Sequence, residues 1–169
     1  MKKILFFLIL SIFFLSGCIH IFVLPDDAEF LALIEELNTP RKACQYMLDN
    51  FVYRPNILKP INPYQLYLCK MGDCDDFSNW GVFFANYHNY ETYQIKIYYK
   101  NTPYSHSLAV YKENGRYNFS NNQYYLFIQA ENFEYIVIYD SYFLMEREWI
   151  KYIVYDYGMN VIEIGYNKI

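Results

Sequence analysis

Histidine and clustered positive charge are both scarce in this sequence, and each shortage narrows what the protein can do. The chain has 3 histidines, and its 14 Lys and Arg residues face 18 Asp and Glu residues, for a formal net charge of −4. It contains no polybasic patch, which argues against nucleic acid as a partner. Cys-x-x-Cys and His-x-x-x-His spacings are absent as well, so we expect neither a metal ion nor a cofactor.

A long apolar run occurs only at the N-terminus, and it is too short to span a bilayer comfortably. Two lysines precede the run Ile4 to Leu15, an order typical of a secretory signal peptide. The run ends in Leu15-Ser16-Gly17-Cys18, which resembles the lipobox of bacterial lipoproteins. This resemblance implies cleavage before Cys18 and a lipid, such as palmitate, on its sulfur. An uncleaved anchor helix is the alternative, and either form places the protein outside the cytoplasm, at a bacterial membrane.

Removal of the signal peptide, residues 1–17, leaves about 150 residues, which is the size of one domain with one core. We expect residues 18–25 to be a lipidated tether and residues 26–169 to be that domain. The leader also carries two lysines, so the mature chain has a formal charge of about −6. Tyrosine is abundant, with 21 residues beside 14 phenylalanines, and this favours strands with aromatic walls around any cleft.

Three cysteines remain if Cys18 carries a lipid. An odd number of thiols in an oxidising compartment leaves at least one of them free, unless it pairs between molecules. A disulfide between Cys44 and Cys69 would leave Cys74 free. Two unpaired, buried thiols are the alternative that the sequence leaves open.

The pattern of apolar residues predicts an α+β domain, with helices first and an antiparallel sheet after them. Asp26 begins a helix with a capping-box-like start, and Thr39 caps a second helix that ends near Asn50. The proline-rich stretch Pro55 to Pro63 predicts a loop or extended segment. A further short helix is expected from Asp140 or Ser141 to about Ile150. The expected strands are residues 93–99, 106–111, 117–120, 133–139, 153–155 and 161–164.

The stretch MGDCDDFSNWGVFFANYH, residues 71–88, places Cys74 at the first turn of a third helix. One face of that helix has small side chains that allow close approach to a sheet, at Cys74, Ser78, Gly81 and Ala85. The helix dipole favours a thiolate there. The neighbouring charges of Asp73, Asp75 and Asp76 raise the thiol pKa instead. Activation of Cys74 therefore requires a base nearby.

His106 is the histidine best placed to be that base. His20 lies in the tether, and His88 lies about 21 Å away along the same helix at 1.5 Å per residue. The turn Asn114-Gly115 predicts a hairpin, whose register sets Asn121 diagonally across from His106 on the same face.

Two further asparagines lie near this position in the sequence. Asn118 and Asn122 fall on the opposite face of the hairpin in this register. We therefore expect Asn121 to be the residue that orients the His106 ring.

The order of these features resembles the transglutaminase-like branch of the papain-like thiol enzymes: GDCDDF before a helix, then a strand that opens with His, then a hairpin return with an amide. The resemblance covers about Leu37 to Tyr125. It implies a papain-like or transglutaminase-like fold in which Cys74 is the nucleophile, His106 the base and Asn121 the third residue. Transglutaminase-like members usually have Asp at the third position, whereas papain-like peptidases use Asn.

The resemblance implies acyl transfer from an amide carbonyl to water, as in a peptidase or amidase, or to an amine, as in a cross-linking enzyme. We expect a protein or peptide substrate, which includes a cell-wall peptide. Gln65 and Tyr67 are upstream candidates for the oxyanion-hole donor that would complement the Cys74 amide. Two alternatives stay open: a catalytically inactive envelope binding module with this fold, and a structural envelope protein.

Overall fold

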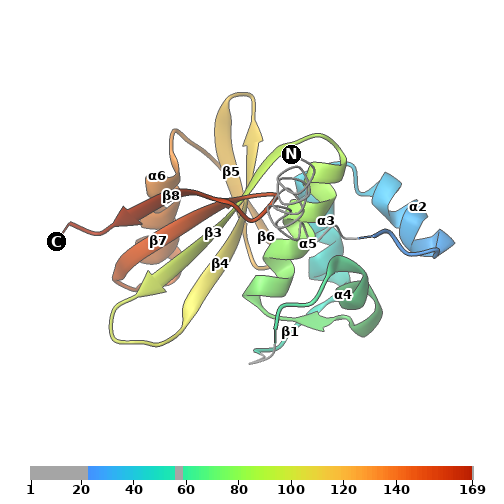
Figure 1. Cartoon of the computed structure of the whole chain (residues 1–169), viewed down its shortest axis with the longest axis horizontal. Coiled ribbons are helices and arrows are strands. Elements are labelled where there is room, and N and C mark those ends of the chain that lie inside the picture. The colour runs from blue at the N-terminus through green and yellow to red at the C-terminus, as the bar shows by residue number, and fades with distance from the viewer. Residues whose placement is uncertain (1–22, 56–58, 169) are drawn as a thin grey trace, which may run out of the picture.

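The computed structural model describes residues 23–55 and 59–168. The helices α2 to α5 gather at one end of the molecule, while a sheet and helix α6 occupy the other (Figure 1). The α+β class predicted from the sequence is confirmed. The predicted signal peptide, the predicted lipidation site Cys18 and most of the predicted tether lie outside the described residues.

Local capping explains where the helices begin. Asp27 caps the first helix, one residue later than predicted, and accepts hydrogen bonds from the backbone N–H groups of Glu29 and Phe30. Thr39 caps the second helix as predicted. A helix that the sequence did not predict follows a capping box between Asn62 and Gln65. The four N-terminal helices are α2 (Ala28–Glu36), α3 (Pro40–Asn50), α4 (Pro63–Cys69) and α5 (Cys74–Tyr87).

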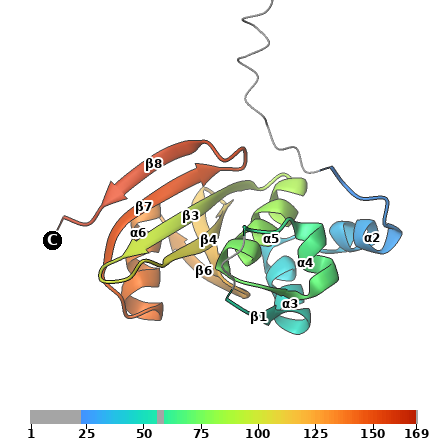
Figure 2. The same cartoon turned by 60° about the horizontal axis from the view of Figure 1, so that its bottom comes forward.

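The main sheet is antiparallel and has the strand order β6-β5-β4-β3-β7-β8 (Figure 2). Its strands are β3 (Glu91–Tyr99), β4 (Ser105–Glu113), β5 (Arg116–Asn121), β6 (Tyr124–Ala130), β7 (Trp149–Asp156) and β8 (Val161–Tyr166). Two short strands, β1 (Val52–Tyr53) and β2 (Met71–Gly72), pair in parallel beside the start of α5. The sequence did not predict β1, β2 or β6.

The prediction of a strand at residues 133–139 is wrong. This segment forms helix α6 (Phe133–Ile138), which continues as a π-helix, η1 (Tyr139–Leu144). The Asn132 side chain caps α6 by accepting from Tyr135 N, and the buried residues Phe133, Ile136 and Val137 recur at helical spacing. The helix expected from Asp140 or Ser141 to about Ile150 is present only in part. The chain is already helical from Phe133, so neither residue is a cap, and the helical segment ends at Leu144, before β7 begins at Trp149.

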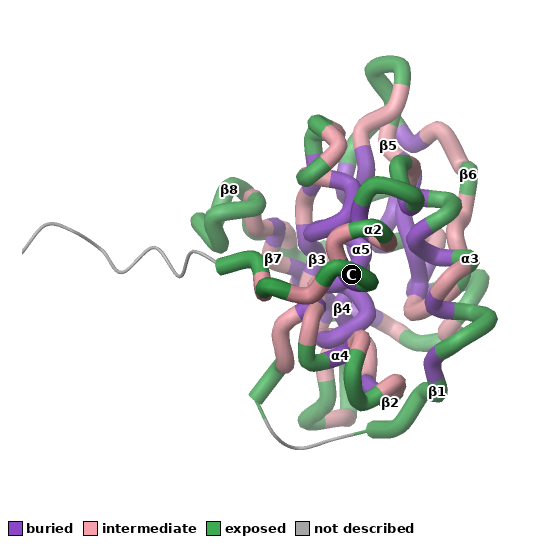
Figure 3. The backbone as a smooth tube through the Cα atoms, turned by 90° about the vertical axis from the view of Figure 1, so that its right-hand side faces the viewer, coloured by how far each residue is buried: buried purple, intermediate pink, exposed green. Residues whose placement is uncertain are grey.

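The two faces of the sheet pack against different helices. Strand β4 alternates, so that Ser107, Ala109 and Tyr111 face α5, whereas Leu108 and Val110 join the core that α6 covers. In Figure 3, α5 is largely buried and β8 is largely exposed. The sheet thus separates the helix that bears Cys74 from α6 and η1.

The close contact between α5 and β4 depends on Gly81, as the small-residue face of the helix predicts. A Cβ atom at Gly81 would overlap the Tyr111 hydroxyl and would lie 3.0 Å from the Ala109 Cβ. Tyr111 is fully buried and hydrogen bonds to Ser120. The hydroxyl therefore cannot simply move out of the way into solvent.

Replacing Gly81 with Ala should destabilise the protein by up to about 2 kcal/mol, because an overpacking cost of about 1 to 3 kcal/mol outweighs the gain in helix propensity of about 1 kcal/mol. Chemical denaturation of wild type and variant measures the difference. Asn86→Ala, a partly exposed position on the same helix, is the control and should be neutral or stabilising. Stabilisation by Gly81→Ala would contradict the tight packing of α5 on β4.

Candidate functional site

The aspartates around Cys74 build the start of α5. The Asp73 side chain accepts from the backbone N–H groups of Asp75 at 3.0 Å and Asp76 at 3.5 Å. Asp76 Oδ2 accepts in return from Asp73 N at 3.0 Å, while its Oδ1 accepts from Ile61 N at 2.8 Å. Gly72 leaves no room for a side chain, since a Cβ there would lie 2.8 Å from that of Asp76. These bonds explain why the sequence GDCDD folds as a rigid helix start.

Asp75 ties this helix start to the sheet. Its Oδ1 accepts a short hydrogen bond from the Ser107 hydroxyl on β4. Its carboxylate also pairs with Lys96 Nζ on β3 at 3.4 Å. The first turn of α5, and Cys74 with it, is thus held against the strand on which His106 lies.

The Cys74 thiol lies in a partly buried position that favours its neutral form. Burial raises the pKa of Cys74 to about 11, and a hydrogen bond from the Ser107 backbone N–H opposes this rise. The charges of Asp75 and Asp73 raise the pKa further, as the sequence predicts, whereas Lys96 lowers it. At neutral pH the thiol therefore needs an imidazolium partner to become a thiolate in quantity.

His106 and Asn121 meet as the hairpin register predicts. Leu108 pairs with Asn121 across β4 and β5, which confirms the predicted register. The His106 Nε2 lies 3.2 Å from Asn121 Oδ1, and both side chains are buried. With Nε2 engaged, Nδ1 is the ring nitrogen left for a proton from the thiol.

The two other asparagines behave differently from each other. Asn118 is on the opposite face as predicted, where its side chain bonds to Glu113 and to the backbone of β6. The placement of Asn122 was wrong. Asn122 follows the last residue of β5 with a φ of 51°, so it has left the strand alternation, and its Nδ2 donates to Asn121 Oδ1 at 3.1 Å. Asn122 therefore belongs to the surroundings of His106.

Cys74 reaches strand β4 where the ladder between β4 and β5 has ended. The β4–β5 ladder ends at Leu108 and Asn121, two residues short of His106. The Cys74 sulfur reaches β4 there, at the backbone N–H of Ser107. Within the described residues, no hydrogen bond joins the sulfur to the His106 ring. The structure thus joins His106 to Asn121 directly, and brings Cys74 to the neighbouring residue on the strand.

Neither upstream candidate for an oxyanion donor is placed for that task. The Gln65 side chain is exposed and closes the capping box of α4. The Tyr67 ring packs on Phe30 of α2, with Lys70 Nζ 3.9 Å from its centroid.

Tyr53 is a polar group near the thiol that the sequence did not identify. It pairs with Gly72 across β1 and β2, and its ring centroid lies 6.1 Å from that of Phe77, one helical turn after Cys74. Burial raises the Tyr53 pKa, and the charges of Cys74, Asp73 and Asp75 raise it further. Its signal in the sequence was weak, because the β1–β2 pair that positions it has only two residues in each strand.

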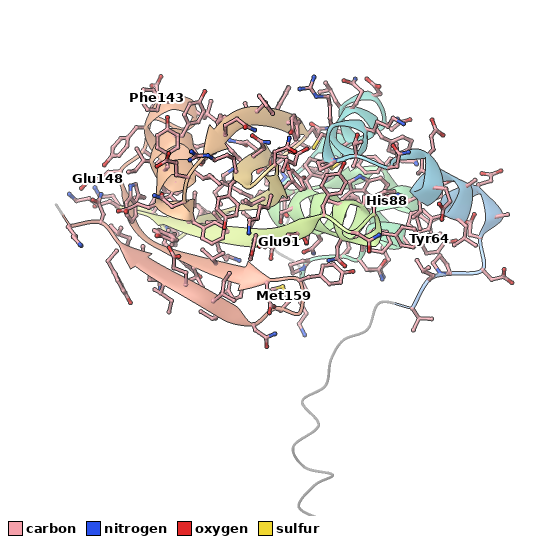
Figure 4. All side chains as sticks on the ribbon, turned by 90° about the horizontal axis from the view of Figure 1, so that it is seen from above. Tyr64, His88, Glu91, Phe143, Glu148 and Met159 are labelled. Atoms are coloured by element: carbon pink, nitrogen blue, oxygen red, sulfur yellow. The ribbon has the colours of Figure 1, made fainter. Side chains whose placement is uncertain are left out.

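Among the described residues, the two other thiols and the second imidazole have contacts elsewhere in the fold. Cys44, Cys69 and Cys74 are all free; Cys44 is buried, 3.8 Å from the Tyr111 hydroxyl, and Cys69 is exposed. Burial raises the pKa of Cys44 to about 12. His88 bonds to the Ile34 carbonyl oxygen at 2.7 Å, at the helical end of the molecule in Figure 4, with Phe143 at the other end.

Two further properties of the described residues bear on function. Across residues 23–55 and 59–168, no group of three His, Cys, Asp or Glu side chains is arranged to hold a metal ion. In the same ranges, no helix has the length and apolarity to cross a bilayer.

Comparison with solved structures finds distant structural similarity. No protein-family model matches the chain, and no curated protein matches it. Among solved structures, the chain is similar to LapG of Legionella pneumophila in its EGTA-treated form, with 11% identity and a TM-score of 0.49. The alignment covers 81% of this chain and 78% of that chain. A similarity of this degree assigns neither a family nor an activity.

The pH dependence of Cys74 alkylation tests whether His106 activates the thiol. In a Cys69→Ser background, which removes the exposed thiol, wild-type Cys74 should react with iodoacetamide near neutral pH. His106→Ala should move the midpoint of the rate profile to higher pH, because burial raises the pKa of the thiol and no imidazolium then opposes that rise. Mass spectrometry locates the label. A wild-type midpoint already near 11 would contradict an ion pair at this site.

Proposed function

We propose that the protein is a transglutaminase-like thiol enzyme that transfers the acyl group of an amide to water or to an amine. The hydrogen bond between His106 Nε2 and Asn121 Oδ1, at the strand to which the Cys74 helix is tied, is the observation that supports this most. The usual third residue of the resembling family is Asp, so the Cys-His-Asn set is closer to that of papain-like peptidases.

The reaction proceeds through a covalent intermediate. The Cys74 thiol gives its proton to His106 Nδ1, and the thiolate attacks the amide carbonyl carbon of the substrate. The tetrahedral intermediate collapses as the imidazolium returns the proton to the leaving amine, which leaves a thioester on Cys74. Water or a second amine then attacks the thioester, with His106 accepting its proton, and the thiol is restored.

The substrate class follows from this chemistry. A protein or peptide supplies the amide, and a cell-wall peptide is one member of that class. We infer that the Cys74 backbone N–H at the start of α5 is one donor for the oxyanion. Tyr53, whose pKa the charge of Cys74 raises, is our candidate for a second donor.

Acylation by an activated ester tests the nucleophile without knowledge of the substrate. Incubation with p-nitrophenyl acetate should release nitrophenolate and add one acetyl group to Cys74. For His106→Ala we expect the rate of nitrophenolate release to fall by at least about 10²-fold. For Cys74→Ala we expect no acetyl group at position 74. Cys69→Ser is the control and should react as wild type. Labelled casein, with and without a fluorescent amine, then separates hydrolysis from transfer.

A catalytically inactive binding module is the second candidate. The high pKa of Cys74, and the missing hydrogen bond between its sulfur and the His106 ring in the part of the chain that the structure describes, favour it. Absence of any acetyl adduct on Cys74 in the folded wild-type protein would support this candidate over the enzyme.

We also propose that the protein is anchored by lipid on the outer side of a bacterial membrane, because the apolar leader ends in LSGC. In a bacterial host, metabolic labelling with an alkyne fatty acid should mark the wild-type chain and yield a mature form that begins at Cys18. Cys18→Ser should remain unlabelled and uncleaved by the lipoprotein pathway. Ser16→Ala, which keeps a small residue, should be processed. Labelling of the Cys18→Ser chain would show that the anchor lies elsewhere.

A further inference from the structure

A carboxylate on the π-helix η1 lies behind the His106–Asn121 pair. Asp140 is fully buried, at a position where the sequence predicted only a helix cap. In the described part of the chain no ion pair joins it to Lys or Arg. A buried carboxylate without a cation next to it is costly to keep, so its retention calls for a role.

Two hydrogen bonds connect Asp140 to the sheet. Asn121 Nδ2 donates to Asp140 Oδ1 at 2.7 Å, and the Tyr99 hydroxyl donates to Oδ2 at 3.1 Å. Since Asn121 Oδ1 faces His106 Nε2 at 3.2 Å, the bonds form a continuous chain from the imidazole to the carboxylate. Three strands and η1 contribute to that chain.

We propose that Asp140 is a positioning residue of this site, which fixes the orientation of the Asn121 amide toward His106 and supplies the negative charge that Asn121 lacks. This rests on the proposed function, in which His106 accepts the proton of Cys74.

The orientation follows from what each group can donate. An ionised carboxylate only accepts, so Asp140 requires Asn121 to present its NH₂ group. The amide oxygen is then turned toward His106, where it accepts a hydrogen bond from Nε2–H. That tautomer leaves the lone pair of Nδ1 free to take the thiol proton. Without Asp140, the amide could rotate and present NH₂ to the ring, which would favour the wrong tautomer.

The charge acts on the imidazolium. The groups that face Asp140 are Tyr99 on β3, His106 on β4 and Asn121 on β5, and the Arg147 guanidinium lies 5.8 Å from the Tyr99 ring centroid. Burial raises the Asp140 pKa, and a charged His106 opposes that rise. An ionised Asp140 therefore attracts the positive charge that the His106 ring gains when it takes up the thiol proton. On the other face of the sheet lie the Asp75–Lys96 ion pair and the Cys74 thiol.

The same contact explains why position 121 is not Asp. A carboxylate at position 121 would face Asp140 across about the 2.7 Å that now separates donor and acceptor. Two carboxylates at such a distance cannot both ionise, so they would share a proton. Transglutaminase-like enzymes usually have a carboxylate in direct contact with the imidazole. In this protein the carboxylate of Asp140 is one hydrogen bond further away, behind Asn121.

Substitutions that exchange Asn121 and Asp140 test whether Asp140 orients the amide and supplies the negative charge. The His106 pKa is measured by NMR of the ring in the full mature chain, with His106→Ala to assign the signal. Asp140→Asn should lower this pKa by roughly 0.5 to 1 unit, less than the roughly 1 to 3 units of a charge in direct contact. Asp49→Asn, on the exposed face of α3, is the matched control and should leave it unchanged.

The double variant Asn121→Asp with Asp140→Asn should restore or exceed the wild-type His106 pKa. In this variant the carboxylate at position 121 contacts the His106 ring, and the amide at position 140 donates a hydrogen bond to that carboxylate. Asn121→Asp alone should take up one extra proton near neutral pH. A merely structural Asp140 predicts instead that the double variant is no better than Asp140→Asn. That result, or an unchanged His106 pKa in Asp140→Asn, overturns the proposal.

These measurements do not depend on turnover, so the two proposals fail separately. If His106 responds to Asp140 but Cys74 accepts no acetyl group, then the positioning is correct and the enzymatic function is wrong. If Cys74 is acylated with His106 dependence and the double variant gives no recovery, then the function stands and Asp140 has no part in it. Denaturation at neutral pH confirms that each variant is folded.

Discussion

The point at which β5 stops pairing with β4 determines which groups can meet at the site. Because the ladder ends at Leu108 and Asn121, the β4 edge next to Ser107 is open to the start of α5. A longer β5 would cover that edge and exclude the Cys74 sulfur from it. The end of β5 also lets Asn122 turn back toward Asn121. The site is therefore a consequence of a strand terminus, where backbone groups remain available for other partners.

The sheet also has to hold two helical elements, α5 and η1, in fixed positions relative to one another. Asp75 holds α5 on one face through Ser107, and Asp140 holds η1 on the other through Asn121 and Tyr99. Both ties are carboxylates that accept from strand residues, and Ser107 and His106 are adjacent on β4. A small displacement of β4 would thus move the thiol, the imidazole and the amide together. This arrangement preserves their relative positions better than a site built on loops.

The parts of this structure that could be predicted from the sequence depend on neighbours within a few residues. Thr39 as a cap, the turn at Asn114 and the pairing of Leu108 with Asn121 are of this kind. The short apolar segment at 133–139 was misassigned, because such a run fits a buried strand or a helix and the cap at Asn132 decides between them. The partners of Asp140 lie 19 and 41 residues away in the sequence, so only the tertiary structure brings them together.

The chemistry of a thiol explains why a remote carboxylate can be sufficient here. At an effective dielectric constant of 20, two unit charges attract by about 4 kcal/mol at 4 Å and by about half as much at 8 Å. Moving the carboxylate behind an amide therefore gives up part of the stabilisation of the imidazolium. A serine nucleophile is neutral before attack, so its histidine depends on a neighbouring carboxylate for that stabilisation. A cysteine instead forms a thiolate that is itself the counter-charge of the imidazolium. The amide then mainly has to orient the ring, and the carboxylate behind it has to orient the amide, which a fully buried Asp140 can do with little freedom to move.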